Sequence, residues 1–208
     1  MEMSRAKVVA CKTLFAAAQC LNDLADRVDD TFAYLVDALE ECRGSVIVTG
    51  VGKCRVIAEK IAATFASSGT FSFPMCALEA LHGDLGRVRR NDFIVALSTS
   101  GETRELLTVV SQSRGAGARV AAITRSRFSS LGRAAEFVLE IGDHPEAGPL
   151  GVFPTTSTTA MLALGDALAM ALVDRRGFDF DDLAKVHPGG FLGAIRSRQS
   201  CASQTTSF

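Results

Sequence analysis

The chain has 208 residues, of which 48% are hydrophobic and 22% charged, and its formal net charge is −1. This length suits one domain of roughly 100–200 residues, its hydrophobic content excludes disorder, and its balance of 22 basic and 23 acidic residues is unlike that of nucleic-acid-binding proteins. Because no uninterrupted apolar run approaches the roughly 18 residues of a membrane span and the N-terminus lacks a signal-peptide pattern, we expect a cytoplasmic protein with no membrane or nucleic-acid partner.

A helical N-terminal arm is predicted over residues 5–42, because apolar side chains recur there close to the 3.6-residue helical period. The pattern favours two consecutive helices. A single long amphipathic arm that forms a dimer surface is the alternative, and the pattern does not separate the two. The apolar positions are Val8, Val9, Leu14, Leu21, Leu24, Val28, Phe32, Leu35, Val36 and Leu39.

Strands and helices alternate over the next hundred residues. Short apolar or β-branched runs predict strands, and the segments between them predict helices. Continuous apolar strands that alternate with helices are typical of an α/β fold, in which helices cover both faces of a parallel sheet. The predicted strands are 45–49, 71–73, 92–97, 119–124 and 137–141, and the predicted helices are 54–68, 77–82, 104–114 and 127–134.

A long apolar helix is predicted at 156–174, and Arg175, Arg176 and Gly177 make a good helix terminus. From residue 196 onward the sequence is rich in Ser, Gln and Thr without periodicity, so we expect residues 196–208 to be a disordered tail. No repeat or interdomain linker divides the rest, which predicts one domain over residues 1–195. The six cysteines form no C-x-x-C pair, and we expect reduced thiols and no metal site.

The segment 98–103, with sequence STSGET, lies between a predicted buried strand and a predicted helix. Ligands of open parallel sheets bind beyond the carboxyl ends of the strands. Hydroxyl groups and a glycine at a helix N-terminus offer free N–H groups and a favourable dipole to a phosphate. An ordinary Ser/Thr helix cap is the alternative, but four hydroxyl residues within six favour a phosphate site.

A second loop, Gly50-Val51-Gly52-Lys53, follows the first predicted strand. It is no Walker A loop, because the first glycine is missing and residue 54 is Cys, and it is no dinucleotide fingerprint, because Arg55 replaces the third glycine. We therefore expect neither a nucleoside triphosphate nor NAD. Lys53 at a helix start opposes the helix dipole, so it either meets an anion or is simply solvated.

Acid–base residues are few. His82 and His187 lie beside Gly and Pro in predicted loops, Glu105 begins a helix next to the hydroxyl loop, and Glu146 lies in an Ala/Gly/Pro loop. Loops carry functional residues more often than cores do. Residue type alone, however, does not show which of these four candidates is catalytic. The residues alone therefore predict a phosphorylated ligand beside several acid–base candidates.

The order of motifs resembles the sugar isomerase (SIS) domain family, and within it the arabinose-5-phosphate isomerase subgroup. The resemblance covers residues 5–195. It implies a three-layer αβα sandwich with a five-stranded parallel sheet, and a dimer of dimers with active sites across subunit interfaces. The motifs that carry it are VTGVGK, EALHGDLG, STSGET, EAGPLGVFPTTSTTA, GDALA and HPGG.

By position, the family's phosphate loop falls on Ser98, Thr99, Ser100 and Thr103, and His82 also lines the pocket. The family's catalytic residues fall on Lys53, Glu105, Glu146 and His187. The resemblance implies interconversion of ribulose 5-phosphate and arabinose 5-phosphate through a cis-enediol, as a step toward the lipopolysaccharide sugar Kdo, with no cofactor or metal. Glu146 or Glu105 would be the base, Lys53 would stabilise the enediolate, and His187 would move protons on hydroxyls or assist ring opening.

Three departures from the family pattern stand out. Cys54 and Arg55 replace the Ser-Gly that usually follows the lysine, and Cys76-Ala77-Leu78 replaces the usual His-Pro-Ala. Many relatives also carry C-terminal CBS modules, for which this chain leaves no room, as in a natural SIS-only form or a truncation. The two replaced segments could change the wall of the pocket or the substrate specificity.

Two other functions remain open. The first is a non-catalytic phosphosugar-binding module, since one fold serves several functions. The joint presence of Lys53, Glu105, Glu146 and His187 favours an enzyme, because a binder needs only the hydroxyl loop. The second is an isomerase for another ketose phosphate.

Overall fold

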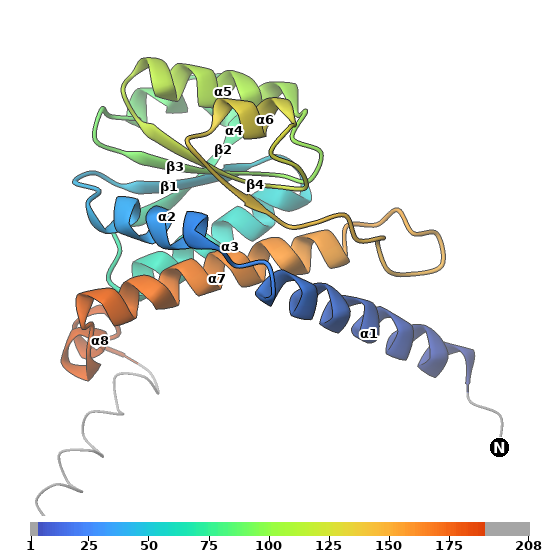
Figure 1. Ribbon diagram of the computed structural model, residues 1–208. Helices are drawn as coiled ribbons and strands as arrows, with labels where there is room; N and C mark the ends of the chain where they lie inside the picture. The colour runs from blue at the N-terminus through green and yellow to red at the C-terminus, as the bar shows by residue number, and fades with distance from the viewer. Residues whose placement is uncertain (1–3, 190–208) are drawn as a thin grey trace, which may run out of the picture.

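Five parallel strands form one sheet in the order β2-β1-β3-β4-β5 in the computed structural model, which describes residues 4–189 (Figure 1). This confirms the predicted parallel sheet of five strands. The strands are β1 (Val46–Gly50), β2 (Ser72–Cys76), β3 (Phe93–Ser98), β4 (Arg119–Thr124) and β5 (Phe137–Glu140).

Helices cover both faces of the sheet and complete the predicted three-layer sandwich (Figure 1). On one face lie α4, α5 and α6. On the other lie α2 and α3, with α7 packed across them and α1 against α7. The helices are α1 (Arg5–Ala25), α2 (Asp30–Glu40), α3 (Lys53–Ser67), α4 (Ala77–Ala80), α5 (Arg104–Gly115), α6 (Ser130–Ala134), α7 (Thr156–Arg176) and α8 (Phe180–Val186), with a 3₁₀ helix, η1 (Asp84–Arg87).

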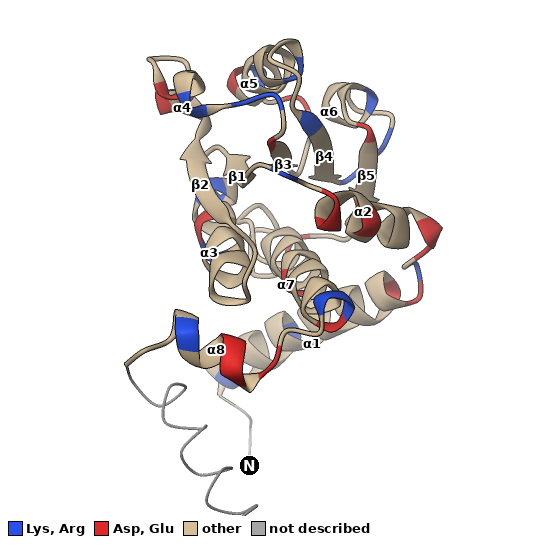
Figure 2. Cartoon of the chain, turned by 90° about the vertical axis from the view of Figure 1, so that its left-hand side faces the viewer, with Lys and Arg blue, Asp and Glu red and all other residues tan. Residues whose placement is uncertain are grey.

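The core lies on both sides of the central strands. Every residue of β1 and β3 is buried, as expected for strands that helices cover on both faces. Figure 2 shows that charged residues gather on helices and loops, whereas the strands are nearly free of them. The sheet is therefore an apolar platform, and polar chemistry is confined to its edges.

The chain reverses its direction of winding between β1 and β3. From β1 it passes through α3 to β2 on one side, and from β2 it crosses to β3, β4 and β5 on the other. The strand register places Gly50 of β1 beside Leu97 of β3, so the loops that follow these two strands are neighbours. In open α/β sheets this reversal creates a crevice beyond the carboxyl ends of the strands, and ligands bind there.

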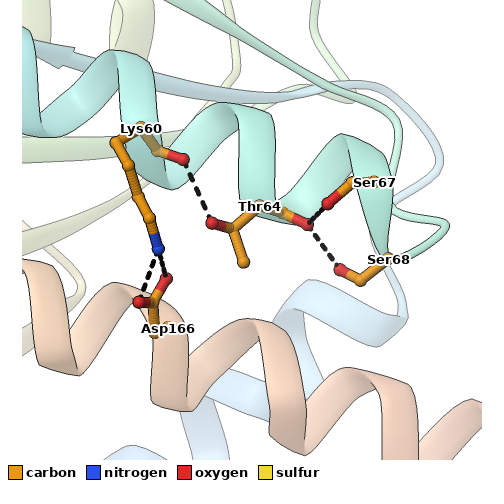
Figure 3. Close-up of polar contacts among 5 residues, drawn as sticks. All are labelled: Lys60, Thr64, Ser67, Ser68 and Asp166. Atoms are coloured by element: carbon orange, nitrogen blue, oxygen red, sulfur yellow. Dashed lines mark hydrogen bonds and ion pairs between the residues drawn. The ribbon is translucent and has the colours of Figure 1, made fainter. Parts of the chain in front are cut away.

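Helix α7 is held against α3 by close apolar packing and by one ion pair. Gly165 lies so close to Ile61 that a Cβ there would overlap the isoleucine side chain. Further toward the surface, Lys60 Nζ donates to both carboxylate oxygens of Asp166, at 2.5 and 2.6 Å (Figure 3). The pair is about half exposed, so we attribute most of the stabilisation to the packing.

By length and composition, α7 could also cross a membrane, which the sequence analysis did not anticipate. Half of its most apolar segment is buried inside the protein, however. Its neighbours are α3, α1 and α2. Core helices of globular proteins share these properties, because a helix that is covered on several sides is apolar nearly all round.

Most predicted elements are confirmed to within a few residues, and the N-terminal arm consists of two helices. Helix α6 begins at residue 130 rather than 127, because the Ser129 hydroxyl caps it by accepting from the N–H of Gly132. Helices η1 and α8 were not predicted. Gly177 ends α7 in the left-handed conformation, as the sequence suggests. The predicted tail at 196–208 lies outside the described residues.

We predict that Gly165→Ala lowers the free energy of unfolding by about 1–3 kcal/mol, because the added methyl forces Ile61 out of its place. The better helix propensity of Ala, worth about 1 kcal/mol, offsets only part of this loss. Thermal or urea unfolding measures the change. Gly115→Ala is the matched control, since a Cβ at Gly115 meets nothing within 4 Å. Equal stability of the two variants would contradict the proposed close packing.

Candidate functional site

The change of winding predicts a ligand crevice between β1 and β3, and two loops, residues 51–52 and 99–103, lie at that place. Each joins the carboxyl end of a fully buried strand to the start of a helix, α3 in the first case and α5 in the second. Because β1 and β3 are paired, the two helices begin at neighbouring strand ends, on opposite faces of the sheet. The sequence-predicted phosphate loop and Lys53 therefore lie at the same edge of the sheet.

The hydroxyl loop is held in shape by its own side chains. Ser98 Oγ accepts from the backbone N–H of Gly101 at 3.0 Å and lies 2.9 Å from Thr103 Oγ1. Ser100 Oγ accepts from the N–H of Glu102 at 3.2 Å. Gly101 has a φ of 70°, and a side chain there would collide with Ser129. The loop is thus a tight turn that only glycine permits at this position.

Neither helix at the crevice has a side-chain cap. Thr103 is the N-cap residue of α5 and Gly52 that of α3, and neither accepts a hydrogen bond from its helix. The first N–H groups of a helix have no partner inside it. Two uncapped N-termini at neighbouring strand ends, with 15 residues of helix in α3 and 12 in α5, offer N–H donors and positive dipole ends of the kind that bind anions.

Lys53 is the first residue of α3, and its exposed side chain makes no hydrogen bond or ion pair with any residue of 4–189. Its ammonium group opposes the dipole of its own helix, so an anion in the crevice would relieve an unfavourable interaction. The neighbouring Arg55 is engaged instead, because it forms an ion pair with Glu59 one turn further along α3. Of these two cationic residues, Lys53 is therefore the one without an ion-pair partner among the described residues.

Cys54, where the family usually has Ser, lies beneath the hydroxyl loop. Its thiol donates to the sulfur of the fully buried Met161 of α7, at 3.9 Å. Burial raises the pKa of Cys54, and hydrogen bonds from the backbone N–H and hydroxyl of Thr99 oppose that rise. A Cβ on Gly50 would lie only 3.0 Å from that of Cys54, so the end of β1 confines Cys54. The thiol of Cys54 thus contacts both α7 and the hydroxyl loop.

Glu105 and His82 lie at the same edge of the sheet. Glu105 is in the first turn of α5, half-buried, and forms no hydrogen bond or ion pair within the described part of the chain. His82 is exposed, shortly after α4, which itself begins where β2 ends. The structure therefore brings both to the edge of the sheet where ligands of open parallel sheets bind.

Glu146 lies in the loop between β5 and α7, and one oxygen of its carboxylate accepts three hydrogen bonds. Oε2 accepts from the N–H of Thr155 at 2.8 Å, the hydroxyl of Thr155 at 3.1 Å and the N–H of Ser157 at 3.3 Å. Burial alone would raise the pKa of Glu146, but hydrogen bonds from Ser157 and Thr155 outweigh it and hold the pKa below its usual value.

His187 is not brought to the crevice within one chain. It follows α8, and its Nδ1 lies 3.3 Å from the carbonyl oxygen of Leu183. It lines an apolar hollow of about 360 Å³ with Ser67 at the end of α3 and with Phe178 and Phe180. Helix α7, about 30 Å long, separates its loop from Glu146, as Figure 1 shows.

Sequence reasoning thus located the two loops but missed two contacts. Nothing in the sequence placed Cys54 against Thr99, because both depend on the pairing of β1 with β3. The clasp of Glu146 on Thr155 was missed as well. Its signal was the spacing of nine residues between the carboxylate and the start of α7, which sequence patterns for helix caps do not include.

A parallel sheet of order β2-β1-β3-β4-β5 with helices on both faces is a doubly wound α/β domain. The SIS domain model matches residues 38–171, and the chain belongs to the SIS domain family. Arabinose 5-phosphate isomerase KdsD of Yersinia pestis is 44% identical over 173 residues, 83% of this chain and 53% of the relative. Arabinose 5-phosphate isomerase GutQ of Salmonella typhimurium is 42% identical over 183 residues, 88% of this chain and 57% of the relative.

Solved structures agree with this assignment. A protein of E. coli CFT073, solved in complex with arabinose 5-phosphate, is 37% identical and superposes with a TM-score of 0.86, covering 90% of this chain and 100% of that one. A Listeria monocytogenes protein with 23% identity, covering 91% of this chain and 100% of its own, has the same TM-score of 0.86, which shows the shared fold. The chain spans only 53% to 59% of the length of curated relatives such as these two isomerases.

We predict that Cys54 reacts with iodoacetamide much more slowly than Cys11 at pH 7.5. Burial raises the pKa of the Cys54 thiol, so less of the reactive thiolate is present, whereas Cys11 is exposed on α1. Peptide mass spectrometry of a labelling time course measures both rates. Labelling of the unfolded chain is the control, because the two rates should then converge. Equal rates in the folded protein would contradict the buried placement of Cys54.

Proposed function

We propose that this protein is an aldose–ketose isomerase that interconverts D-arabinose 5-phosphate and D-ribulose 5-phosphate. The observation that carries the proposal is the pair of uncapped helix N-termini at the switch point, with the unpaired Lys53 on one and Glu105 on the other. Relatives that carry this activity in their names are about 40% identical, which supports the choice of a five-carbon phosphosugar.

The phosphate of the substrate would occupy the N-terminus of α5. There, the N–H groups of the first turn have no side-chain cap, and the hydroxyls of Ser98, Ser100 and Thr103 add short donors. Thr99 donates hydrogen bonds from its backbone N–H and its hydroxyl to the Cys54 thiol. It would therefore support the hydroxyl loop as well as line the site. His82 would border the opposite side of the crevice. The near-neutral charge of the chain is compatible with this ligand, because the anion is met locally.

The reaction moves one proton between C1 and C2 and needs no oxidant or reductant. A carboxylate, Glu105 or Glu146, takes the carbon-bound proton, and the electron pair of the C–H bond forms the C=C bond of the enediolate. Lys53 stabilises the negative charge that develops on the carbonyl oxygen, and the carboxylic acid returns the proton to the other carbon. His187 transfers protons between hydroxyl oxygens or assists ring opening.

The active site would be completed by a second copy of the chain. Glu146 binds the start of α7, whereas His187 follows α8, beyond the end of α7, so one chain does not bring all four catalytic candidates together. A partner that presents its own His187 at the crevice removes this separation. We infer a homo-oligomer, a dimer of dimers, with each site shared between subunits. The SIS unit would extend over residues 1–195 and act in the cytoplasm as part of lipopolysaccharide precursor synthesis.

Turnover of pentose phosphates tests the function directly. We expect ketose formation from arabinose 5-phosphate and none from ribose 5-phosphate under the same conditions. Lys53→Ala should lower kcat by about 10²–10⁴-fold, the range typical of a group that stabilises a charged transition state. Binding without turnover would instead establish a non-catalytic phosphosugar-binding module. Turnover of a hexulose phosphate alone would establish a different isomerase.

Mixing of two inactive variants tests the shared site. If Lys53 and His187 of one site come from different subunits, dimers of Lys53→Ala with His187→Ala contain one intact site and one doubly altered site. Random reassortment should then restore about a quarter of the wild-type activity, since half the dimers are mixed and each has one of two sites intact. Lys53→Ala mixed with Lys53→Arg is the control, which should stay inactive. No restoration after verified subunit exchange would contradict the shared site.

A further inference from the structure

The loop that precedes α7 is closed at its base by two residues, Glu146 and Thr155. Besides the three bonds that Glu146 Oε2 accepts, Thr155 Oγ1 accepts from the N–H of Ala147 at 2.8 Å. The intervening residues 147–154 therefore form a loop whose two ends are fastened together. The tip of this loop is apolar and exposed, since Leu150, Val152 and Phe153 are between 59% and 69% exposed.

The same carboxylate provides the cap that α7 otherwise lacks. Thr155 is the N-cap residue of this 21-residue helix, and its side chain accepts no hydrogen bond from the helix. The hydroxyl oxygen of the buried Thr156 has no hydrogen-bond partner within the described residues. Oε2 of Glu146 is thus the side-chain acceptor for the N–H groups of Thr155 and Ser157, and its charge matches the positive end of the helix dipole.

Glu105 differs from Glu146 in every one of these respects. It lies in the first turn of α5, directly after the hydroxyl loop, and its carboxylate has no partner within the part of the chain that the structure describes. A base must reach the substrate with a free lone pair. Three donors already occupy one oxygen of Glu146, and withdrawing that carboxylate would uncap α7 and open the loop.

We propose that Glu146 is a positioning residue, which fastens the loop 147–154 and caps α7, and that Glu105 is the base. This assignment rests on the proposed isomerase function and divides the roles that remain open there. The carboxylate of Glu105 forms an O–H bond with the proton from C2 of the aldose while the C–H bond breaks. The electron pair of that bond forms C1=C2, and the carbonyl π pair moves to O1. His187 transfers the O2–H proton to O1, the O2 electron pair forms C2=O2, and the C1=C2 pair takes the proton back from Glu105 at C1 to give the ketose.

Four variants separate the two roles. Glu146→Gln keeps an oxygen that accepts from the N–H groups of Thr155 and Ser157, so its kcat should fall less than about fivefold. Glu105→Gln removes the base, and its kcat should fall by about 10²–10⁴-fold with an unchanged melting temperature. Glu146→Ala removes the acceptor as well and should lose activity together with stability. Glu136→Gln, in an exposed pair with Arg119, is the matched control and should behave as the wild type.

The pH profile separates positioning from chemistry. Glu146→Gln should retain the acidic limb of kcat against pH, because the titrating base is still present, whereas the residual activity of Glu105→Gln should have lost that limb. A Glu146→Gln variant that melts like the wild type but has lost kcat by a hundredfold or more would overturn the assignment. So would a Glu105→Gln variant with near-normal turnover.

Thermal unfolding tests the cap without relying on any activity. Glu146→Ala should lower the melting temperature by about 2–4 °C at pH 7, the range for loss of one helix cap in a domain of this size, and Glu146→Gln should lower it less. Since the pKa of Glu146 is lower when the protein is folded, the carboxylate stabilises the fold above its ordinary pKa. That contribution is lost as the pH falls through the folded value, so the difference between wild type and Glu146→Gln should shrink below about pH 4.

The isomerase proposal and the capping role of Glu146 can be contradicted separately. If the wild type turns over no pentose phosphate, the isomerase proposal fails, yet the unfolding experiment still decides whether Glu146 caps α7. If the wild type is active and Glu146→Ala melts like the wild type with an unchanged pH dependence, the cap is wrong and the isomerase proposal stands.

Discussion

The change in the direction of winding between β1 and β3, which are parallel neighbours, is the constraint on which the rest of this structure depends. It places the carboxyl ends of two fully buried strands side by side, and each of these strands leads directly into a helix. Two helix N-termini without side-chain caps are thereby held at neighbouring strand ends of a rigid apolar platform. Their unpaired N–H groups are fixed by the same packing that holds the strands.

The second organising element is α7, which ties the remote parts of the molecule together. Through Gly165 it approaches α3 closely, through Met161 it touches the thiol beneath the phosphate loop, and at its N-terminus it holds the carboxylate of Glu146. Each contact joins a functional segment to the same helix. A displacement of α7 would therefore disturb the phosphate loop and the loop 147–154 together, which gives a physical reason for the tight packing on α3.

Much of this architecture could be read from the sequence because it is set locally. Apolar runs such as 92–97 and 119–124 predict buried strands wherever they fall, and STSGET predicts an anion site from its own residues. Helix α8 was missed because its seven residues carry a capping box at Asp179 and Asp182 but no long apolar period. The contacts of Cys54 and Glu146 were unpredictable for another reason, since they arise only when segments far apart in the chain are packed.

The catalytic candidates form no single cluster in one chain, and this follows from the geometry of the fold rather than from any local distortion. Lys53, Glu105 and the hydroxyl loop are fixed by strand ends at one edge of the sheet, whereas His187 follows α8, beyond the end of α7, a helix about 30 Å long. To reach the strand ends within one chain, His187 would have to leave the apolar hollow that it lines with Phe178 and Phe180, and α8 would have to unfold. In the proposed homo-oligomer, the histidine of one chain would reach the strand ends of another without that cost.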